Sequence, residues 1–273
     1  MTENIAENDK LRSEYMRSII QNRVPLETCS GPSLIPKVII QFWHNLDDLP
    51  EDVQECINSW KILEHDGFDR ILIDNTRARE FIKNEYGEPY ISAYEYCHHP
   101  AMRCDYFRLC YLFKYGGFYL DADELYQGVD CKQYFQSDKL KIQPLCYDLL
   151  SHSMVSPEKF IDGKEFSENW IYYANNNPII SPSNHPIIRK ALERSTSILL
   201  NSNQNLNIQS TTGPGNLSAS IVAHLIDSTS TKGIECLRII PDWNKVSISP
   251  WPLSYRNDKR NWRLWDNARN WKY

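Results

Sequence analysis

The sequence has no excess of basic residues and no long apolar run. Its 273 residues include 30 Lys and Arg against 35 Asp and Glu, a net charge of −5, so a broad basic face for nucleic acid is not expected. No segment reaches the run of about 18 uninterrupted apolar residues that suggests a membrane-spanning helix. The polar, acidic start at 1–10 lacks the pattern of a secretory signal. We therefore expect a cytoplasmic protein without a nucleic-acid partner.

The eight cysteines include no Cys-x-x-Cys pair, and the chain is long enough to bury a core without disulfides. We expect most of them to be reduced, partly buried thiols. The densest group contains Cys97, His98, His99 and Cys104. It lacks the spacing and the second ligand pair of a zinc site, so a structural role is the favoured interpretation.

Repeats, low-complexity segments and obvious linkers are also absent, which favours a single domain over 1–273. Segments rich in β-branched and aromatic residues alternate with segments of helical periodicity, and this predicts an α/β fold whose mostly parallel sheet has helices on both faces. We expect 1–34 to be a helical N-terminal appendage and 240–273 to be a segment rich in tryptophan and basic residues. The expected strands are 37–43, 68–74, 118–120 and 170–174, and the expected helices are 9–23, 50–63, 76–86, 101–115, one from Pro186 and one after Gly215.

Two carboxylates, Asp121 and Asp123, directly follow the short apolar strand at 118–120. Buried and unpaired, they would repel each other and lose hydration. A divalent cation, Mn²⁺ or Mg²⁺, removes both problems and accepts phosphate oxygens as further ligands. Ligands of open α/β sheets also bind beyond the carboxyl ends of strands. The pair therefore predicts a metal site, with a solvated acidic turn as the alternative.

Asp105 and Arg108 lie three residues apart on the helix expected before this strand, so they share a face. An acid beside a guanidinium can hold sugar hydroxyls, although a surface ion pair would show the same spacing. The helix ends at Gly116 and Gly117, which suit a left-handed helix C-terminus. Together these features favour a sugar site next to the metal site.

The order Asp-x-x-Arg, then Tyr-Gly-Gly-x-Tyr-x-Asp-x-Asp, resembles the DXD region of glycosyltransferase family 32. This family includes yeast-type α-1,6-mannosyltransferases and bacterial capsule or lipopolysaccharide sugar transferases, and the catalytic domains of clostridial glucosylating toxins are similar. The segment 35–43, Ile-Pro-Lys-Val-Ile-Ile-Gln-Phe-Trp, is similar to the family's first strand. The segments 184–186 and 212–214 are similar to two weaker landmarks. The resemblance is strongest over 35–130, extends to about 220 and is poor beyond.

The resemblance implies a GT-A, Rossmann-like nucleotide-sugar-binding fold, a nucleotide-sugar donor, a divalent metal and a retaining outcome. It implies that Trp43 stacks on the nucleotide base, whereas the structural alternative is a core aromatic residue. It further implies that Asp105 and Arg108 grip the donor sugar. Asp121 would contact the ribose and the sugar, and Asp123 would hold the metal. The same two acids are the expected catalytic pair.

Weaker substrate or lid roles follow for His185, Thr212, Gly213 and Trp262. His185 has the alternative of a turn residue before a helix, because a proline suits the first turn. Gly213 has the alternative of a tight loop.

The C-terminal segment departs from the family pattern. Family members commonly end with a His and a Trp that complete the metal and diphosphate site, but no histidine follows His224 here, so the third metal ligand stays open. Trp262 or a basic neighbour could close over the diphosphate as a lid. Trp262 and Trp265 could instead lie on an anionic bilayer, at the inner face of a membrane and near a lipid-linked acceptor. A packed helix with a basic face is the third interpretation. The tryptophans and cations concerned are Trp243, Trp251, Trp262, Trp265, Trp271, Arg256, Lys259, Arg260, Arg263, Arg269 and Lys272.

We therefore expect a metal-dependent, retaining hexosyltransferase that uses a nucleotide sugar, UDP- in preference to GDP-. Its expected acceptor is a glycan, in free or lipid-linked form, in cell-surface polysaccharide or lipopolysaccharide assembly. A toxin-like effector that modifies a protein is the main alternative. A haloacid-dehalogenase phosphatase is disfavoured because its motif does not continue with Glu-Leu, as at 124–125. A glycoside hydrolase gives the Asp-x-x-Arg helix no role, and a carbohydrate-binding module leaves the acid pair unexplained.

Overall fold

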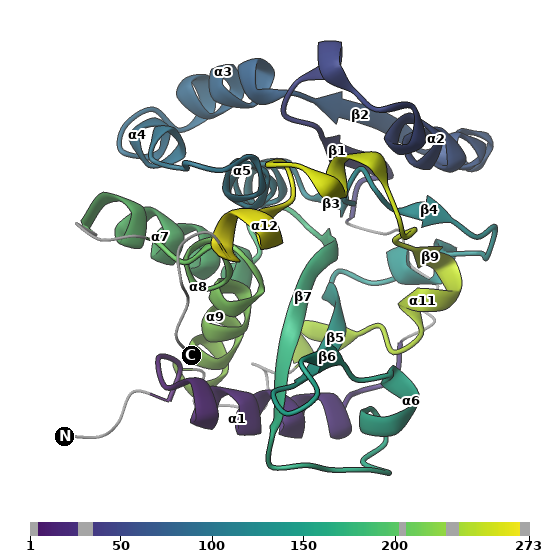
Figure 1. Cartoon of the computed structure of the whole chain (residues 1–273), viewed down its shortest axis with the longest axis vertical. Coiled ribbons are helices and arrows are strands. Elements are labelled where there is room, and N and C mark those ends of the chain that lie inside the picture. Colours follow the sequence, from purple (N-terminus) through teal and green to yellow (C-terminus); the bar gives the residue numbers. More distant parts are fainter. Residues whose placement is uncertain (1–4, 27–34, 202–205, 228–234, 268–273) are drawn as a thin grey trace.

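The structure is a computed structural model that describes residues 5–26, 35–201, 206–227 and 235–267 (Figure 1). The strands are β1 (Val38–Phe42), β2 (Asp69–Ile73), β3 (Gly117–Tyr119), β4 (Leu125–Tyr126), β5 (Leu140–Asp148), β6 (Ser153–Met154), β7 (Trp170–Ser181), β8 (Leu237–Ile239) and β9 (Ser247–Ile248). The α-helices are α1 (Asp9–Gln21), α2 (Glu51–Ser59), α3 (Asn75–Glu85), α4 (Tyr90–Glu95), α5 (Pro100–Tyr115), α6 (Pro157–Phe160), α7 (Pro186–Asn201), α8 (Ile208–Thr211), α9 (Pro214–Asp227), α11 (Trp243–Val246) and α12 (Trp262–Asn267). The 3₁₀ helices are η1 (Leu46–Asp48), η2 (Trp60–Asp66), η3 (Lys132–Phe135) and η4 (Ser254–Asn257).

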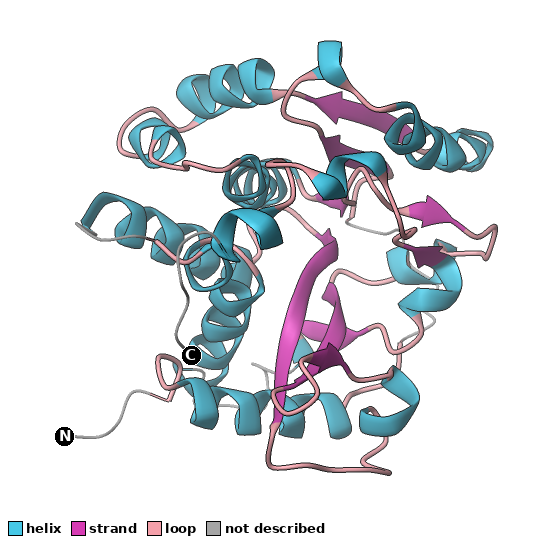
Figure 2. Ribbon diagram, in the orientation of Figure 1, coloured by secondary structure: helices cyan, strands magenta, loops and turns pink. Residues whose placement is uncertain are grey.

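Seven strands form one central sheet in the order β2-β1-β3-β7-β5-β6, and β8 pairs with β5. The strands β2, β1 and β3 are parallel to one another, as the sequence predicts. Beyond them, β7 pairs antiparallel with both β3 and β5, while β5 and β8 are parallel. Helices flank this sheet (Figure 2). The expected α/β fold is confirmed, and the long strand β7 is the element that joins its parallel part to its antiparallel ladders.

Side chains alternate between the two faces of the sheet, and each face has its own core. Ile39, Phe118 and Ile180 belong to one buried cluster, which also contains Trp60 and Trp243. Their chain neighbours in β1, β3 and β7 belong to the larger cluster, to which α1, α4, α5, α7 and α9 contribute. The sheet is therefore covered on both faces, and only its edges and strand ends are left for a site.

The helix α1 forms where the sequence predicts one, but it is part of the main core. Met16 and Ile20 are fully buried in that core, and the helix packs on β7 and α9. The expectation of an appendage was wrong. Met16, Ile19 and Ile20 give this polar helix a narrow apolar stripe, and that stripe packs against the sheet. Within the described ranges, no helix has the length and apolarity to cross a bilayer.

The turn between α5 and β3 requires glycine. Gly116 has φ +71° and ψ −166°, which lies outside the left-handed helical region that the sequence predicts, in a region that is essentially limited to glycine. A Cβ atom on Gly116 would lie 2.6 Å from the Ser183 backbone nitrogen and 2.8 Å from the Ser181 carbonyl oxygen. This close approach lets α5 lead directly into β3, so the residues of both elements meet at the far end of the strand.

Candidate active site

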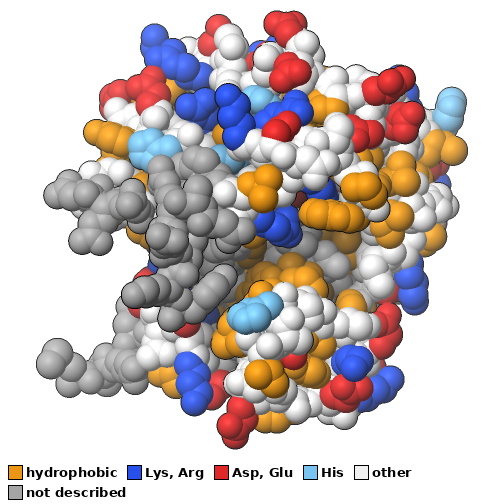
Figure 3. Space-filling view, viewed as in Figure 1, with side chains coloured by type: hydrophobic (Ala, Val, Ile, Leu, Met, Phe, Trp, Pro, Cys, Tyr) orange, Lys and Arg blue, Asp and Glu red, His pale blue; other side chains and the backbone are white. Residues whose placement is uncertain are grey.

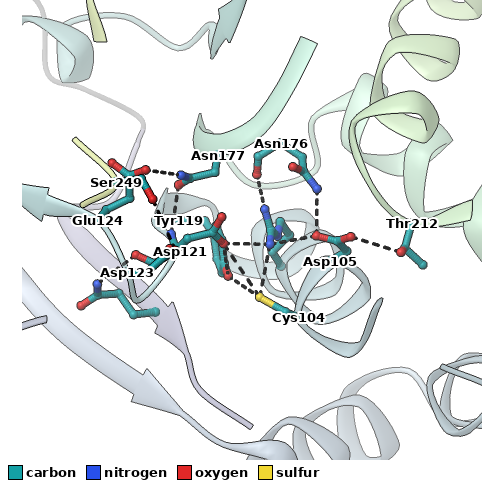
Figure 4. A network of polar contacts seen from close by, with 12 residues as sticks. Cys104, Asp105, Tyr119, Asp121, Asp123, Glu124, Asn176, Asn177, Thr212 and Ser249 are labelled. Carbon is teal, nitrogen blue, oxygen red and sulfur yellow. Dashed lines mark hydrogen bonds and ion pairs between the residues drawn. The ribbon is translucent and has the colours of Figure 1, made fainter. Parts of the chain in front are cut away.

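The parallel arrangement of β1 and β3 places two predicted site segments at the same edge of the sheet. Ile40 pairs with Tyr119, so the carboxyl ends of both strands point the same way. Trp43 directly follows β1, and Asp121 and Asp123 follow β3. Ligands bind at this edge in open α/β sheets. Residues of α5 and the residues that precede Pro178 in β7 also reach this edge (Figure 4).

Arg108 is the centre of a buried polar cluster. Its Nη1 donates to the Asn176 carbonyl oxygen, and its Nη2 donates to Asp121 Oδ1 at 2.9 Å. The guanidinium also contacts Cys104 Sγ at 3.2 Å and lies over the Tyr119 ring, 4.2 Å from its centroid. Its Nε is buried and has no hydrogen-bond partner in the described part of the chain. The guanidinium is therefore held in one orientation, with one N–H left for another acceptor.

Asp105 shares this cluster. Its carboxylate lies 2.9 Å from Arg108 Nη2, as the spacing of the two residues predicts. It accepts hydrogen bonds from Asn176 Nδ2 at 2.8 Å and from Thr212 Oγ1 at 3.2 Å. Burial raises the pKa of Asp105 to about 6, although Arg108 opposes this shift. The pair is thus a buried ion pair instead of a surface one.

Asp121 connects the cluster to the strand end. Its Oδ1 accepts from Arg108 and from the Tyr119 hydroxyl at 3.1 Å. Its backbone N–H donates to Asn177 Oδ1 at 2.9 Å, and its carbonyl accepts from Gln41 Nε2 at 3.4 Å. Loss of hydration raises the pKa of the Asp121 carboxyl, and Arg108 acts in the opposite direction. These contacts fix both the side chain and the backbone of Asp121.

Asp123 points to a different set of partners, all of them in the C-terminal segment. Its Oδ2 accepts from the Tyr255 hydroxyl at 2.6 Å, from Arg256 Nη2 at 2.6 Å and from Ser249 Oγ at 3.4 Å. The Asp123 side chain is 15% exposed and that of Arg256 is 9% exposed. The C-terminal segment therefore forms part of the site, although the resemblance to a known family ends before it.

Glu124 adds a third acid behind the pair. Its carboxylate is buried and accepts from Asn177 Nδ2 at 2.9 Å and from Ser247 Oγ. Its carbonyl accepts from Trp60 Nε1 at 2.8 Å. Burial, followed by the charge of Asp123, raises the pKa of Glu124 to about 7. Glu124 links the turn that carries the two acids to β7 and to β9.

The two acids keep oxygens that suit a divalent cation. Within the described residues, no hydrogen bond or ion pair reaches Asp121 Oδ2 or Asp123 Oδ1. Mg²⁺ and Mn²⁺ are commonly held by one or two carboxylates together with water and substrate phosphates. Within the same residues, no group of three His, Cys, Asp or Glu side chains could hold a metal. The donors present therefore fit a cation that shares its coordination with a phosphate ligand.

Trp43 lies beside the acid turn. It belongs to a small apolar cluster with Ala122, the residue between the two acids. Its ring centroid lies 5.3 Å from that of Tyr255, edge to face, and its Nε1 donates to the Asp48 carbonyl. Trp43 is 8% exposed. Stacking on a nucleotide base stays a prediction.

Of the weaker candidates, the structure brings Thr212 to the cluster through its bond to Asp105. The neighbouring Gly213 is packed tightly against α8, where an added Cβ would lie 3.2 Å from Gln209 Cα. Trp262 begins α12, is half-buried against the main core and has Arg263 over its ring at 4.5 Å. The side chain of Trp265 and all of Trp271 lie outside the described residues.

The structure does not bring His185 to the cluster. Its Nδ1 accepts from the Ile187 N–H at the start of α7, and its Nε2 lies 3.2 Å from the Cys236 carbonyl oxygen. Burial lowers the pKa of His185 to about 4. Because Ser181 pairs with Gly117, His185 follows the end of β7 that is remote from Asp121. It lies directly before α7, where the sequence alternative placed a turn residue, and its ring also caps the helix.

The cysteine and histidine group at 97–104 is dispersed. Cys97 Sγ is buried near the Ala93 carbonyl, and His98 is exposed. His99 caps α5 by accepting from the Ala101 N–H at 3.0 Å. Cys104 instead belongs to the Arg108 cluster. Each of these side chains has a structural position of its own.

Sequence reasoning missed the two asparagines that hold the acids in place. Asn176 binds Asp105 and Arg108, whereas Asn177 binds Asp121 and Glu124 (Figure 4). The run of three asparagines before Pro178 is the only local signal, because polar amides are unusual at the end of a strand that reads as buried.

The C-terminal segment and the β5–β6 hairpin flank a hollow on one face of the molecule. Figure 3 shows hydrophobic side chains gathered along both sides of this hollow. Exposed hydrophobic residues of these segments include Leu150 and Met154 in the hairpin and Trp251 and Leu264 in the C-terminal segment. This face therefore offers both apolar and charged groups to a ligand.

Comparison with known proteins identifies the same stretch of chain. Residues 50–131 match the family model described as the glycosyltransferase sugar-binding region containing the DXD motif. Inositol phosphoceramide mannosyltransferase 2 of Schizosaccharomyces pombe is 30% identical over 45% of this chain and 38% of its own length. Mannosyl phosphorylinositol ceramide synthase SUR1 of Saccharomyces cerevisiae is 37% identical over 34% of this chain and 24% of its own length. The chain thus matches well under half of either relative.

Among solved structures, the PaToxG glycosyltransferase aligns with a TM-score of 0.48 and 17% identity, over 83% of this chain and 80% of its own. Residues 50–131 contain α5, β3 and the acid turn, so the matched region holds Asp105, Arg108, Asp121 and Asp123. Residues 50–131 are therefore similar to the sugar-binding region of the DXD-motif glycosyltransferases, as the resemblance predicts.

Proposed function

We propose that the protein is a metal-dependent, retaining glycosyltransferase that moves a hexose from a nucleotide sugar, UDP- in preference to GDP-, to a glycan acceptor. The proposed process is the assembly of a cell-surface polysaccharide or lipopolysaccharide. One observation carries the proposal: Asp105, Arg108 and Asp121 form a single hydrogen-bonded cluster at the sheet edge where Asp123 also lies. Sugar-binding groups and metal-binding groups are therefore adjacent, as a nucleotide sugar requires.

The Arg108 cluster provides the proposed donor-sugar site. The buried Nε of Arg108 has no partner among the described residues, and the partly exposed Asp121 keeps Oδ2 for a ligand. Such groups can hold sugar hydroxyls. Asn176 and Asn177 fix their positions before the sugar arrives, so little ordering is needed on binding.

Asp123, with the second oxygen of Asp121, provides the proposed metal and diphosphate site. A divalent cation held there supplies charge stabilisation for the departing nucleoside diphosphate. Retention is proposed through attack by the acceptor hydroxyl on the face from which the diphosphate leaves. The hydroxyl proton passes to the departing phosphate oxygen, so no side chain is assigned as a base.

The acceptor is proposed to be lipid-linked. The C-terminal segment exposes Trp251 and Leu264, and these apolar side chains would let the segment rest on a membrane surface. The names of the two yeast relatives favour a second candidate for sugar and acceptor, namely mannose and an inositol phosphoceramide-type lipid. Both candidates use the same donor site.

A screen of purified nucleotide sugars with Mn²⁺ tests this proposal. Donor hydrolysis and transfer are measured for UDP- and GDP-linked hexoses, with free glycans and with glycolipids in vesicles. We expect one donor to be turned over only with a divalent cation, and Asp123→Ala to abolish that turnover. Turnover that is equal with and without cation, or unchanged in the Asp123 variant, would contradict the proposed metal site.

A further inference from the structure

We infer that Arg256 is the resident counter-cation of Asp123 and is exchanged for a divalent metal, after which Arg256 binds the donor diphosphate. This inference rests on the proposed function. It assigns to Arg256 a role in binding that no motif of the sequence indicates.

The geometry shows that Arg256 holds the carboxylate assigned to the metal. Arg256 Nη2 lies 2.6 Å from Asp123 Oδ2 and accompanies the Tyr255 hydroxyl on the same oxygen. Ser249 Oγ accepts from the same Arg256 Nη2 at 2.5 Å. The Arg256 guanidinium also lies over the Trp251 ring, 4.5 Å from its centroid. The ion pair is thus nearly buried and held on several sides.

A metal ion at Asp123 competes with this arrangement. Two cations at one largely buried carboxylate repel each other, and little water is present to screen them. Within the described residues, Asp123 is the acid that forms an ion pair with Arg256. Metal binding therefore weakens the hold on Arg256 without offering it another acid.

The donor diphosphate offers that replacement. Arginine presents a planar fork of N–H donors that matches phosphate oxygens, and Arg256 Nε is buried without a hydrogen-bond partner in the described residues. The segment that carries Arg256 is anchored by the pairing of β9 with β4 and by Ser254, whose backbone N–H donates to Asp52 Oδ2 at 2.6 Å. A short shift from Asp123 to a phosphate bound next to it is therefore sufficient.

This exchange couples the two ligands. Metal alone competes with Arg256 for the charge of Asp123, whereas metal together with a diphosphate gives Arg256 a new partner. The two ligands should therefore bind with positive cooperativity, and the coupling should depend on Arg256.

Titration of Mn²⁺ followed by electron paramagnetic resonance, without and with UDP, tests the inference on the full chain. In Arg256→Gln we expect Mn²⁺ alone to bind about tenfold more tightly than in the wild type, and UDP in the presence of Mn²⁺ to bind about tenfold more weakly. Damage to the fold would weaken both, so the opposite signs are the diagnostic result. Arg260→Gln is the matched control, because Arg260 lies in the same segment but pairs with Asp258 and Asp48. It should change neither affinity.

Ser249→Ala provides a second variant that does not remove a charge. It deletes an acceptor that holds Arg256, so Mn²⁺ alone should bind a few-fold more tightly. Unchanged or weaker Mn²⁺ binding in both Arg256→Gln and Ser249→Ala would overturn the inference. If Mn²⁺ has no effect on UDP affinity in the wild type, the proposed function itself fails, which is a separate outcome.

Discussion

Arg108 Nη2 lies 2.9 Å from Asp121 Oδ1, so the Asp-x-x-Arg helix and the Asp-x-Asp strand end form one site. The two motifs are 13 residues apart at these positions and belong to different elements. The sharp turn at Gly116 brings them together, and the asparagines of β7 hold both in place. A substitution on the helix should therefore alter the position of Asp121 at the end of β3.

Substitutions of the helix pair should impair recognition of the sugar more than that of the nucleotide. Asp105→Ala and Arg108→Ala are each expected to lower kcat/KM for the donor sugar by at least about tenfold. Each removes a member of the polar cluster that is proposed to hold the sugar hydroxyls. Affinity for the bare nucleoside diphosphate should stay within about twofold. Calorimetry with diphosphate and with nucleotide sugar checks this. Arg108→Lys keeps a positive charge beside Asp121 but loses the forked N–H donors of the guanidinium. It therefore separates the loss of sugar binding from the loss of the ion pair that holds Asp121.

Glu124 should act as a positioning residue for the acid turn. Glu124→Gln keeps a side-chain oxygen for Asn177 and an amide for Ser247, so we expect near wild-type Mn²⁺ affinity and stability. Glu124→Leu leaves Asn177 Nδ2 buried without its acceptor and should reduce the free energy of unfolding by about 1–3 kcal/mol. It should also weaken Mn²⁺ binding. Urea denaturation and Mn²⁺ titration measure the two effects, and equal behaviour of the Gln and Leu variants would argue against positioning.

His185 should make the fold sensitive to acid. Nδ1 accepts from Ile187, so the neutral ring carries its proton on Nε2, and burial lowers its pKa from 6.5 to about 4. The stabilisation is full above pH 6.5 and is lost as pH falls, because the unfolded chain takes up the proton first. Between pH 6.5 and 5 the loss should be about 2 kcal/mol. His185→Asn keeps a capping acceptor but does not titrate, so its stability curve should be flatter, and parallel curves would contradict this account.

Gly116 should be intolerant of any side chain. Gly116→Ala places a Cβ atom within 3 Å of the backbone at 181–183 and forces φ +71° on an alanine. We expect a loss of unfolding free energy of at least about 1 kcal/mol. Gly67→Ala is the matched control, because Gly67 also has a positive φ, +81°, but nothing lies within 4 Å of an added Cβ. Thermal unfolding should show the larger loss for Gly116→Ala, because Gly116 combines the close contact with ψ −166°, whereas Gly67 has ψ +27° in the left-handed helical region.

The parts of the fold that depend on local pattern could be predicted from the sequence. The helix that contains Asp105 and Arg108, and the strand that precedes Asp121 and Asp123, form where periodicity and glycines indicate them. The parallel relation of β1 and β3 follows from the alternation of strands and helices. The fixed partners of the four side chains did not follow from either feature.

The rest depends on contacts between distant segments. Asn176 meets Arg108 across 68 residues, and Arg256 meets Asp123 across 133. No spacing rule indicates which polar residue of a later segment reaches a buried acid. The burial of α1 was missed for a related reason: its few apolar residues are sufficient only because β7 and α9 lie opposite them.

Calorimetry of UDP binding, with and without Mn²⁺, tests the central claim most directly. The account predicts that Mn²⁺ raises UDP affinity strongly in the wild type and has little effect in Asp123→Asn, since that carboxylate and Asp121 share the cation with the diphosphate. UDP binding of equal strength without the metal, or an undiminished Mn²⁺ effect in Asp123→Asn, would contradict it.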